Sequence, residues 1–351
     1  MKKFLLSFCF LWVVLFSYAD HYKVLFIGNS YTEVNNLPQL ISHLATSTGD
    51  TVEYAAQTPG GCTFQQHLTG ALSLIRQGGW DYVVLQEQSQ LPSFPESQFM
   101  SQCYPFATQL CDTIRKYNPE ANIVFYMTWG RKNGDQQNCP YFPPLCTYEG
   151  MDSLLYERYM MLAEDNQAMV SPVGYVWRYI RSNFPDIELY QADESHPSLA
   201  GSYAAACTFY TTLFGKTPIW IATDENVPAD QAVIIRDVVA ELVFDSLERW
   251  SFLTPSDTTS GDSVTVHFYE SDNILLYPNP VAHVLNIQCS DPGYISVSVY
   301  DEEGKLWVKK LLHGEGTYAL PIENLPVGVF LLHISHGKNR SSIHKFIKTS
   351  E

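Results

Sequence analysis

Basic residues are scarce in this sequence. Its 351 residues include 21 lysines and arginines against 37 aspartates and glutamates, which gives a formal net charge of −16 at pH 7. Such an acidic chain repels nucleic-acid phosphates and anionic lipid headgroups. We therefore expect neither nucleic acid nor an anionic membrane surface as a partner.

The eight cysteines form no Cys-x-x-Cys pair, and a zinc site built from them is not expected. Cys139 and Cys146 flank a short Pro-rich loop that a local disulfide can close. A chain that is exported can form such a bridge, because disulfides persist in oxidising compartments.

The N-terminus has no apolar run of the ~20 residues that a membrane-spanning helix needs. Lys2 and Lys3 precede an apolar stretch that extends to about Phe16 and is followed by Ser17-Tyr18-Ala19. This order is typical of a secretory signal peptide, here residues 1–19, with cleavage after Ala19. Loss of the two lysines changes the formal charge from −16 to −18. An uncleaved membrane anchor is the alternative.

Short apolar runs alternate with helical patterns from residue 20 to 250. The predicted strands are Val24–Gly28, Val52–Gln57, Tyr82–Gln86, Asn122–Thr128 and Met169–Ser171. The predicted helices are Leu37–Thr48, Phe64–Gln77, Glu96–Tyr117, Met151–Asn166, Val173–Asn183, Ser198–Phe214 and Asp230–Trp250. Continuous apolar strands between helices indicate a parallel sheet covered on both faces. Residues 20–250 are therefore predicted to form a three-layer α/β/α domain.

The composition changes after residue 250. Residues 251–273 are rich in Ser, Thr and Asp and are predicted to be a linker. Residues 274–351 carry closely spaced strand patterns such as 284–287, 295–300 and 329–334. This spacing predicts a small antiparallel β-sandwich.

Ser30 follows the first predicted strand in the sequence Gly28-Asn29-Ser30. Ligands of open α/β sheets bind beyond the carboxyl ends of the strands, where Ser30 is expected. Thr32 stands where a Gly-x-Ser-x-Gly elbow would have its second glycine, so the α/β-hydrolase motif is absent. An ordinary structural turn is the alternative interpretation of these residues.

Asp193 and His196 lie three residues apart near the end of the same domain. A base that activates a serine needs an imidazole whose second nitrogen is held by a carboxylate, and this pair meets that requirement locally. A helix start at His196-Pro197-Ser198 explains the same residues. Two metal ligands are a further alternative.

Two other segments follow predicted strands and can supply donors for an oxyanion. Gly60 and Gly61 follow the second strand, where a glycine lets the backbone N–H approach a substrate closely. Gln86 and Gln88 follow the third strand, and either side-chain amide can donate a further hydrogen bond.

This order of blocks resembles the SGNH, or GDSL-like, hydrolase family over residues 22 to about 215. The resemblance implies a flavodoxin-like fold with Ser30 as nucleophile, His196 as general base and Asp193 as its partner. It also implies an oxyanion hole formed by the N–H groups of Ser30 and of Gly60 or Gly61, together with an amide side chain. No metal or other cofactor is implied.

The sequence departs from the family pattern in two blocks. Asn29 replaces the aspartate of Gly-Asp-Ser, which alters the local charge. Residues 86–89, Gln-Glu-Gln-Ser, replace Gly-x-Asn-Asp and look more like the Gln-Gly-Glu-Ser of the carbohydrate acetylesterase branch. In that alignment Gln86 is the oxyanion donor, which we favour, whereas the asparagine-type alignment makes it Gln88.

The C-terminal region resembles the type A sorting domain of the type IX secretion system of Bacteroidota. The resemblance lies in the Tyr-Pro-Asn-Pro at 277–280, in residues 299–305 and 325–330, and in the Lys-Phe-Ile-Lys at 345–348. It implies passage across the outer membrane through the secretion machinery, and such a domain is commonly removed at the cell surface. A carbohydrate-binding or interaction sandwich is the alternative.

Together these features predict a secreted serine esterase that acts through an acyl-enzyme. The expected substrate is an O-acetyl group on a carbohydrate, on the strength of the export signals, the Gln86 block and aromatic residues such as Trp129, Tyr141, Phe142 and Trp177. A lipid or simple acyl ester is an alternative substrate. A catalytically degenerate surface protein that binds glycans is an alternative function.

Overall fold

The structure is a computed structural model that describes residues 19–253, 274–289, 294–301, 306–313, 316–336 and 340–350. The chain divides into two compact units, Met1–Pro255 and Ser256–Glu351. Almost all of the predicted signal peptide (1–19) and of the predicted linker (251–273) lies outside the described residues. No helix in the described ranges is long and apolar enough to cross a membrane.

The first unit is built on a parallel sheet of five strands. These are β1 (His21–Ile27), β2 (Thr51–Gln57), β3 (Tyr82–Leu85), β4 (Asn122–Tyr126) and β5 (Met169–Ser171), in the spatial order β2-β1-β3-β4-β5. The chain moves outward from β1 to β2 and then crosses to β3 on the other side of β1. The carboxyl ends of β1 and β3 therefore meet at a topological switch point, which is where open α/β sheets bind ligands.

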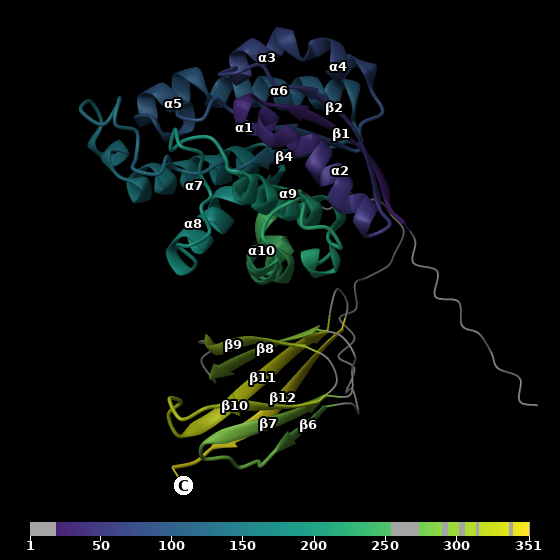
Figure 1. The fold of residues 1–351 in the computed structure, drawn as a ribbon, viewed down its shortest axis with the longest axis vertical. Coiled ribbons are helices and arrows are strands. Elements are labelled where there is room, and N and C mark those ends of the chain that lie inside the picture. Colours follow the sequence, from purple (N-terminus) through teal and green to yellow (C-terminus); the bar gives the residue numbers. More distant parts are fainter. Residues whose placement is uncertain are drawn as a thin grey trace, which may run out of the picture. The chain divides into compact units, whose positions relative to one another are not determined.

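Helices cover both faces of this sheet, as predicted (Figure 1). They are α1 (Ser30–Glu33), α2 (Leu37–Ser47), α3 (Phe64–Gly70), α4 (Leu72–Gln77), α5 (Glu96–Gln102), α6 (Tyr104–Tyr117), α7 (Tyr148–Asp165), α8 (Val173–Asn183), α9 (Leu199–Phe214) and α10 (Ala229–Leu242). On one face α3 and α4 pack against α6, and on the other α2 packs against α9 with α10 outside it. The three-layer α/β/α fold is thus confirmed.

Three predicted helices were wrong in extent. Helix 96–117 is broken at Cys103, because Pro105 in the first turn of α6 has no N–H and cannot continue a helix from α5. Helix 64–77 divides after Gly70, a poor helix former. Helix 230–250 ends at Leu242 and continues as a 3₁₀ segment, Phe244–Trp250.

The second unit consists of two antiparallel sheets. Its strands are β6 (Ile274–Tyr277), β7 (Val284–Cys289), β8 (Tyr294–Asp301), β9 (Leu306–His313), β10 (Gly316–Pro321), β11 (Gly328–His336) and β12 (Arg340–Lys348). The sheet orders are β10-β7-β6 and β12-β11-β8-β9. Alternate residues of these strands, such as Leu285, Ile287, Val297 and Val299, form a hydrophobic core separate from that of the first unit. The predicted antiparallel β-sandwich is confirmed.

The Tyr-Pro-Asn-Pro segment is tied to the last strand of the second unit. Asn279 donates through Nδ2 to the Lys345 carbonyl at 3.0 Å and accepts from the Ile347 N–H through Oδ1 at 3.0 Å. Its side-chain amide therefore mimics a strand neighbour of β12. These contacts explain why the two parts of the C-terminal pattern occur together.

Candidate active site

Ser30 is the first residue of α1, immediately beyond the carboxyl end of β1. Its N–H is among the first amides of a helix, which have no intrahelical acceptor. The strand reaches this point by a close approach to β3: a Cβ at Gly28 would lie 2.6 Å from Thr32 Oγ1 and 2.7 Å from Gln86 Oε1. A side chain at this position would displace the Thr32 and Gln86 side chains, so packing favours the Gly28 of the motif.

Asn29, between β1 and Ser30, connects this segment to the neighbouring loops. It is 2% exposed, and its Oδ1 accepts hydrogen bonds from Tyr31 N at 3.3 Å and Gln86 Nε2 at 3.0 Å. Its Nδ2 donates to the carbonyls of Cys62 and Glu87, at 3.1 and 3.2 Å. A carboxylate cannot make these two donations. From the sequence, Asn29 was noted only because it replaces the aspartate of Gly-Asp-Ser and alters the local charge. Its hydrogen bonds could not be predicted, because its partners Cys62, Gln86 and Glu87 are far away in the sequence.

Asp193 and His196 lie on the loop between α8 and α9. Asp193 Oδ1 accepts from the N–H groups of Ser195 (3.0 Å) and His196 (2.9 Å), and Oδ2 is hydrogen-bonded to His196 Nδ1. Partial burial opposes ionisation of the carboxyl group. The hydrogen bonds from His196 and from the two backbone amides outweigh this effect and lower the pKa of Asp193.

The His196 imidazole contacts Ser30, which is far away in the sequence. His196 Nε2 lies 2.9 Å from Ser30 Oγ, across 166 residues of sequence. With the Nδ1 proton donated to Asp193, Nε2 is left to accept from the serine hydroxyl. The His196 and Asp193 side chains are 30% and 47% exposed, so solvent reaches the pair. The structure thus brings Ser30, His196 and Asp193 together in the geometry of a nucleophile, its base and an orienting acid.

A stack of buried aromatic rings supports the loop that carries His196. The Tyr31 ring lies on Trp129 (centroids 4.8 Å apart, interplanar angle 3°), which in turn lies on Trp177 (3.7 Å, 9°). Tyr31 Oη is 2.7 Å from Ser195 Oγ, and Trp129 Nε1 donates to the Ser195 carbonyl at 3.1 Å. Trp129 and Trp177 are fully buried. Both rings belong to the core, so neither supports the carbohydrate substrate expected from the sequence.

Gly60 and Gly61 form an exposed turn between β2 and α3. Cys62 N donates to the Pro59 carbonyl at 3.1 Å, and Gly61 has a φ of +68° that favours glycine. Space within 4 Å of a Cβ at either position is open. Asn29, through the Cys62 carbonyl, ties this turn to the segment that carries Ser30.

The two glutamines after β3 lie in different surroundings. Gln86 is fully buried, and its amide nitrogen donates to Asn29 Oδ1 at 3.0 Å and to the Glu87 carbonyl. Gln88 is half-buried, and its Nε2 donates to Gln90 Oε1 at 3.0 Å. The Gln86 amide is therefore engaged inside the protein, which differs from the placement expected of an oxyanion donor. Of the two, Gln88 has the more accessible side chain.

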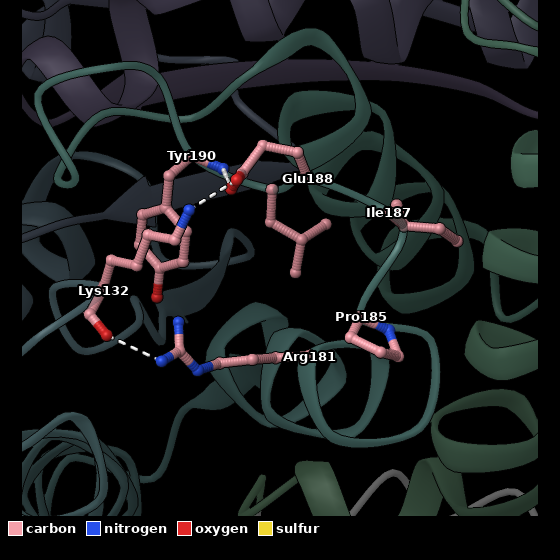
Figure 2. Close-up of a pocket in the computed structure, with 7 residues that line it drawn as sticks. Lys132, Arg181, Pro185, Ile187, Glu188 and Tyr190 are labelled. Atoms are coloured by element: carbon pink, nitrogen blue, oxygen red, sulfur yellow. Dashed lines mark hydrogen bonds and ion pairs between the residues drawn. The ribbon is translucent and has the colours of Figure 1, made fainter.

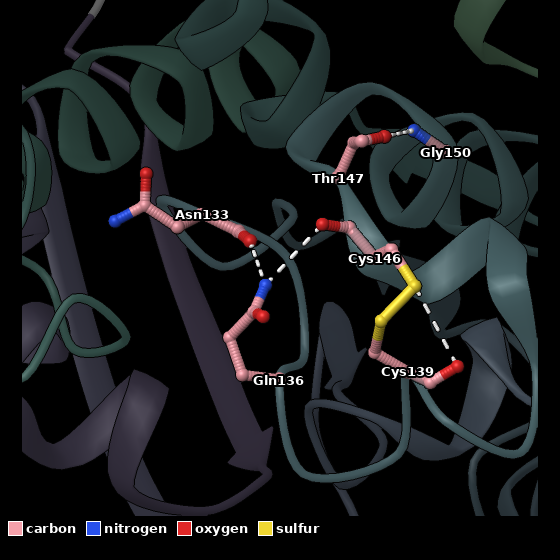
Figure 3. Close-up of a disulfide and its surroundings, with 6 residues drawn as sticks. All are labelled: Asn133, Gln136, Cys139, Cys146, Thr147 and Gly150. Carbon is pink, nitrogen blue, oxygen red and sulfur yellow. Dashed lines mark hydrogen bonds between the residues drawn. A yellow bond between two sulfur atoms is a disulfide. The ribbon is translucent and has the colours of Figure 1, made fainter.

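The loop between β4 and α7 lies next to the His196 loop. Lys132 N donates to the Glu194 carbonyl at 2.9 Å, and Asn133 Nδ2 donates to Glu194 Oε2 at 2.8 Å. A disulfide between Cys139 and Cys146 closes the far part of this loop (Figure 3). The predicted pairing of these cysteines is thus present.

The disulfide loop is also anchored to the segment after β3. Asp135 is fully buried, and its Oδ2 accepts from Gln90 Nε2 at 2.6 Å and from Asn138 Nδ2 at 2.7 Å. Gln136 Nε2 donates to the Cys146 carbonyl at 3.2 Å (Figure 3). Tyr141, at the tip, is 86% exposed.

A cavity of about 240 Å³ lies beside this loop (Figure 2). Lys132 and Glu188 form an ion pair at 2.5 Å across it, and Arg181 Nη2 donates to the Lys132 carbonyl at 2.7 Å. Lys132 and Glu188 neutralise one another, and Ser30, Asp193 and His196 do not line the cavity. Within the described residues, no three His, Cys, Asp or Glu side chains gather closely enough to hold a metal ion.

Residues 275–349 match the family model described as a secretion system C-terminal sorting domain. No curated protein matches the chain in sequence. Several solved structures resemble the first unit. A DUF4886 family protein from Bacteroides uniformis is 19% identical with a TM-score of 0.56, over 64% of this chain and 96% of that chain.

Two further solved structures show lower TM-scores. A candidate SGNH hydrolase from Slackia heliotrinireducens is 27% identical (TM-score 0.46; 55% of this chain, 100% of that chain). A catalytic mutant of an acetylxylan esterase from Geobacillus stearothermophilus is 16% identical (TM-score 0.40; 59% and 99%). The solved structures similar to the first unit include proteins described as an SGNH hydrolase and a GDSL-like lipase. Residues 275–349 match the sorting domain that the sequence predicted there.

Proposed function

We propose that the first unit is a serine esterase with Ser30 as nucleophile, His196 as general base and Asp193 as the acid that orients it. The observation that carries this proposal is the 2.9 Å approach of His196 Nε2 to Ser30 Oγ while Nδ1 is hydrogen-bonded to Asp193. A serine hydroxyl is a weak nucleophile unless an adjacent base takes its proton.

In the proposed reaction, His196 Nε2 takes the hydroxyl proton as Ser30 Oγ bonds to the ester carbonyl carbon. The imidazolium then gives this proton to the departing alkoxide, which leaves as an alcohol. Water, deprotonated by His196, attacks the acyl-enzyme, and the proton returns to Ser30 Oγ as the acid leaves. Asp193 stays ionised throughout, which its lowered pKa favours.

The proposed oxyanion donors are the N–H of Ser30 and the N–H of Gly60 or Gly61. The first is an amide at the start of α1, and the second belongs to an open turn tied to Asn29. Gln88 is the better candidate for a third donor, because the Gln86 amide is buried and already engaged. Removal of one such donor typically costs about 3–4 kcal/mol of transition-state stabilisation.

We further propose that the substrate is an O-acetyl group on a carbohydrate. The Gln86-Glu87 segment supports this through its resemblance to carbohydrate acetylesterases, and export to the surface supports a polymer outside the cell. Tyr141 is an exposed aromatic residue of the disulfide loop, whereas Trp129 and Trp177 are buried and give no support. A lipid or simple acyl ester is the alternative within the same reaction class.

The sorting domain at residues 275–349 indicates secretion or display at the cell surface. We propose the outer-membrane secretion machinery as its partner, and a signal peptide at residues 1–19 for the first export step.

Steady-state kinetics of the full-length protein test this function. Wild type, Ser30→Ala and His196→Ala are compared on p-nitrophenyl acetate and on acetylated xylan. We expect turnover by the wild type and a loss of about 10³-fold or more in kcat for each variant. Wild-type rates in Ser30→Ala would refute the proposal. Turnover of the aryl ester without release of acetate from the polymer would refute only the carbohydrate substrate.

A further inference from the structure

A buried carboxyl group lies beside the candidate site but takes no part in the proposed proton transfers. Glu87 directly follows β3 and is fully buried. Burial raises its pKa to about 7, although the hydrogen bonds from Gln88 N and Phe64 N lower it in part. Burial of a carboxyl group costs free energy unless its oxygens are hydrogen-bonded, so the contacts of Glu87 indicate its role.

One oxygen of Glu87 holds two of the three segments that follow β1, β2 and β3. Its Oε1 accepts from Phe64 N at 3.0 Å and from Gln88 N at 2.6 Å. Phe64 is the first residue of α3, at the end of the segment that carries Gly60 and Gly61. Gln88 belongs to the loop after β3. The carboxyl group therefore fixes the glycine turn relative to that loop.

The backbone of the same residue holds the third loop. The Glu87 carbonyl accepts from Asn29 Nδ2 at 3.2 Å and from Gln86 Nε2. Asn29 is the neighbour of Ser30 and also donates to the Cys62 carbonyl at the end of the glycine turn. The segments that carry Ser30, the glycine turn and Gln88 thus all bond to one residue.

The titratable groups that face Glu87 are Cys62, Cys103 and Tyr159. They come from the glycine turn, from the junction of α5 and α6, and from α7. No lysine, arginine or histidine forms an ion pair with Glu87 within the described part of the chain. Oε2 makes no hydrogen bond of ordinary geometry there, although the Cys103 thiol faces the carboxyl group and lowers its pKa in part. The role of the side chain therefore depends on Oε1 as an acceptor rather than on a salt bridge.

We propose that Glu87 is a positioning residue that aligns the glycine turn with Ser30, so that N–H groups from both converge on one substrate oxygen. This inference rests on the proposed esterase function. Donors must lie about 2.7–3.1 Å from the oxyanion, and a displacement of about 1 Å can cost about 10²-fold in rate. Glu87 touches neither substrate nor reacting atoms.

A matched pair of variants tests this role in the full-length protein. Glu87→Gln keeps a carbonyl acceptor in place of Oε1, whereas Glu87→Met keeps the length of the side chain and removes the acceptor. On p-nitrophenyl acetate we expect Glu87→Met to lower kcat about 10–100-fold with KM within about threefold of wild type. We expect Glu87→Gln to retain kcat within about threefold.

Asp50→Ala is the control for lost stability. Asp50 is a buried carboxylate that accepts from the backbone N–H of Asp20 at 2.9 Å and pairs with Lys216, at the opposite edge of the sheet. We expect it to lower the thermal midpoint at least as much as Glu87→Met while kcat stays unchanged. Equal loss of kcat in Asp50→Ala, or equal loss in Glu87→Gln and Glu87→Met, would overturn the positioning role.

Ser30→Ala separates this inference from the function on which it rests. Wild-type turnover that Ser30→Ala abolishes supports the proposed function. If kcat in Glu87→Met then equals that of wild type, only the positioning role is overturned. If the wild type and Ser30→Ala hydrolyse the ester equally, the proposed function fails, whatever the Glu87 variants do.

Discussion

At the scale of single residues, Asn29 is the side chain on which the edge of the candidate site depends most. Its amide both donates and accepts, and Asn29→Asp would place a carboxylate oxygen against the carbonyls of Cys62 and Glu87. We expect this substitution to lower the free energy of unfolding by about 2–4 kcal/mol, because each carbonyl loses the donation from Nδ2 and faces a carboxylate oxygen instead. Urea denaturation of both proteins measures the difference.

Asn183→Asp is the matched control for that measurement. Asn183 also donates through Nδ2 to a carbonyl, that of Tyr179, but it lies on the surface. We expect a change within about 0.5 kcal/mol. An Asn29→Asp protein as stable as the wild type would show that the hydrogen bonds of Asn29 do not hold the loops together.

Glu87 makes a second residue-scale prediction, which concerns pH. Its pKa is about 7 in the folded protein and about 4.5 when the chain unfolds. Between these values the folded state binds the proton and the unfolded state does not, so this residue's contribution to stability falls as pH rises. Relative to wild type, Glu87→Gln should therefore gain stability between pH 5 and pH 8, by on the order of 3 kcal/mol.

The measurement is the free energy of unfolding of both proteins at several pH values. Glu164→Gln, on the surface of α7, serves as the control for removal of a surface carboxylate. If the difference between wild type and Glu87→Gln is constant from pH 5 to pH 8, Glu87 is not protonated near neutral pH.

The residue scale also shows where sequence was insufficient. Ser30, His196 and Asp193 could be proposed because the order of the blocks that hold them resembles that of SGNH hydrolases. The engagement of the Gln86 amide could not, since its partner Asn29 is 57 residues away and either glutamine fits the local pattern. The spacing of residues within one segment does not predict a contact between side chains of two segments that are far apart in the sequence.

At the scale of elements, the Cys139–Cys146 disulfide stabilises the loop between β4 and α7. A bridge that closes so short a loop is worth about 2–3 kcal/mol in the chain-entropy model. We expect the double variant Cys139→Ser/Cys146→Ser to have a lower thermal midpoint than the wild type. Reductant should lower the midpoint of the wild type and leave that of the double variant unchanged.

The comparison of wild type and double variant is specific for the Cys139–Cys146 bridge, because the other cysteines in the described residues are free thiols. Cys103, Cys111 and Cys207 are buried thiols, and Cys62 is half-buried and unpaired. Reductant has no further bridge to break among these four. An equal effect of reductant on the wild type and on the double variant would contradict the assignment.

The elements also differ in how well sequence predicted them. Strands β1, β3 and β4 were found because each contains a continuous apolar run, which is what burial on both faces of a parallel sheet requires. Strand β2 lies at the edge of the sheet and is mostly exposed, so its apolar pattern is weaker. The break at Cys103 was missed because the apolar period continues from Phe99 to Ile114 across it, and only Pro105 marks the new helix. Periodicity alone does not detect a turn that leaves the apolar face aligned.

At the scale of the whole molecule, each of the two units has its own hydrophobic core. A unit with its own core generally folds alone. We expect a protein truncated after Pro255 to keep the kcat of the full-length chain within about twofold. In a bacterium with the secretion machinery, the same truncation should leave the protein inside the cell envelope.

Cell fractionation together with esterase assays of each fraction measures both outcomes. The control is the full-length Ser30→Ala protein, which should be exported without activity. Export of the truncated protein at wild-type levels would contradict the role assigned to residues 275–349. Loss of activity on truncation would show that the two units depend on each other.

The most direct test of the central claim is covalent labelling of the proposed nucleophile. The full-length protein is treated with a fluorophosphonate ester, and the adduct is located by intact mass and peptide mapping. We predict one adduct on Ser30, absent from Ser30→Ala and formed at least about 10²-fold more slowly in His196→Ala. A wild-type protein that stays unlabelled, or that is labelled on another serine, would contradict the account.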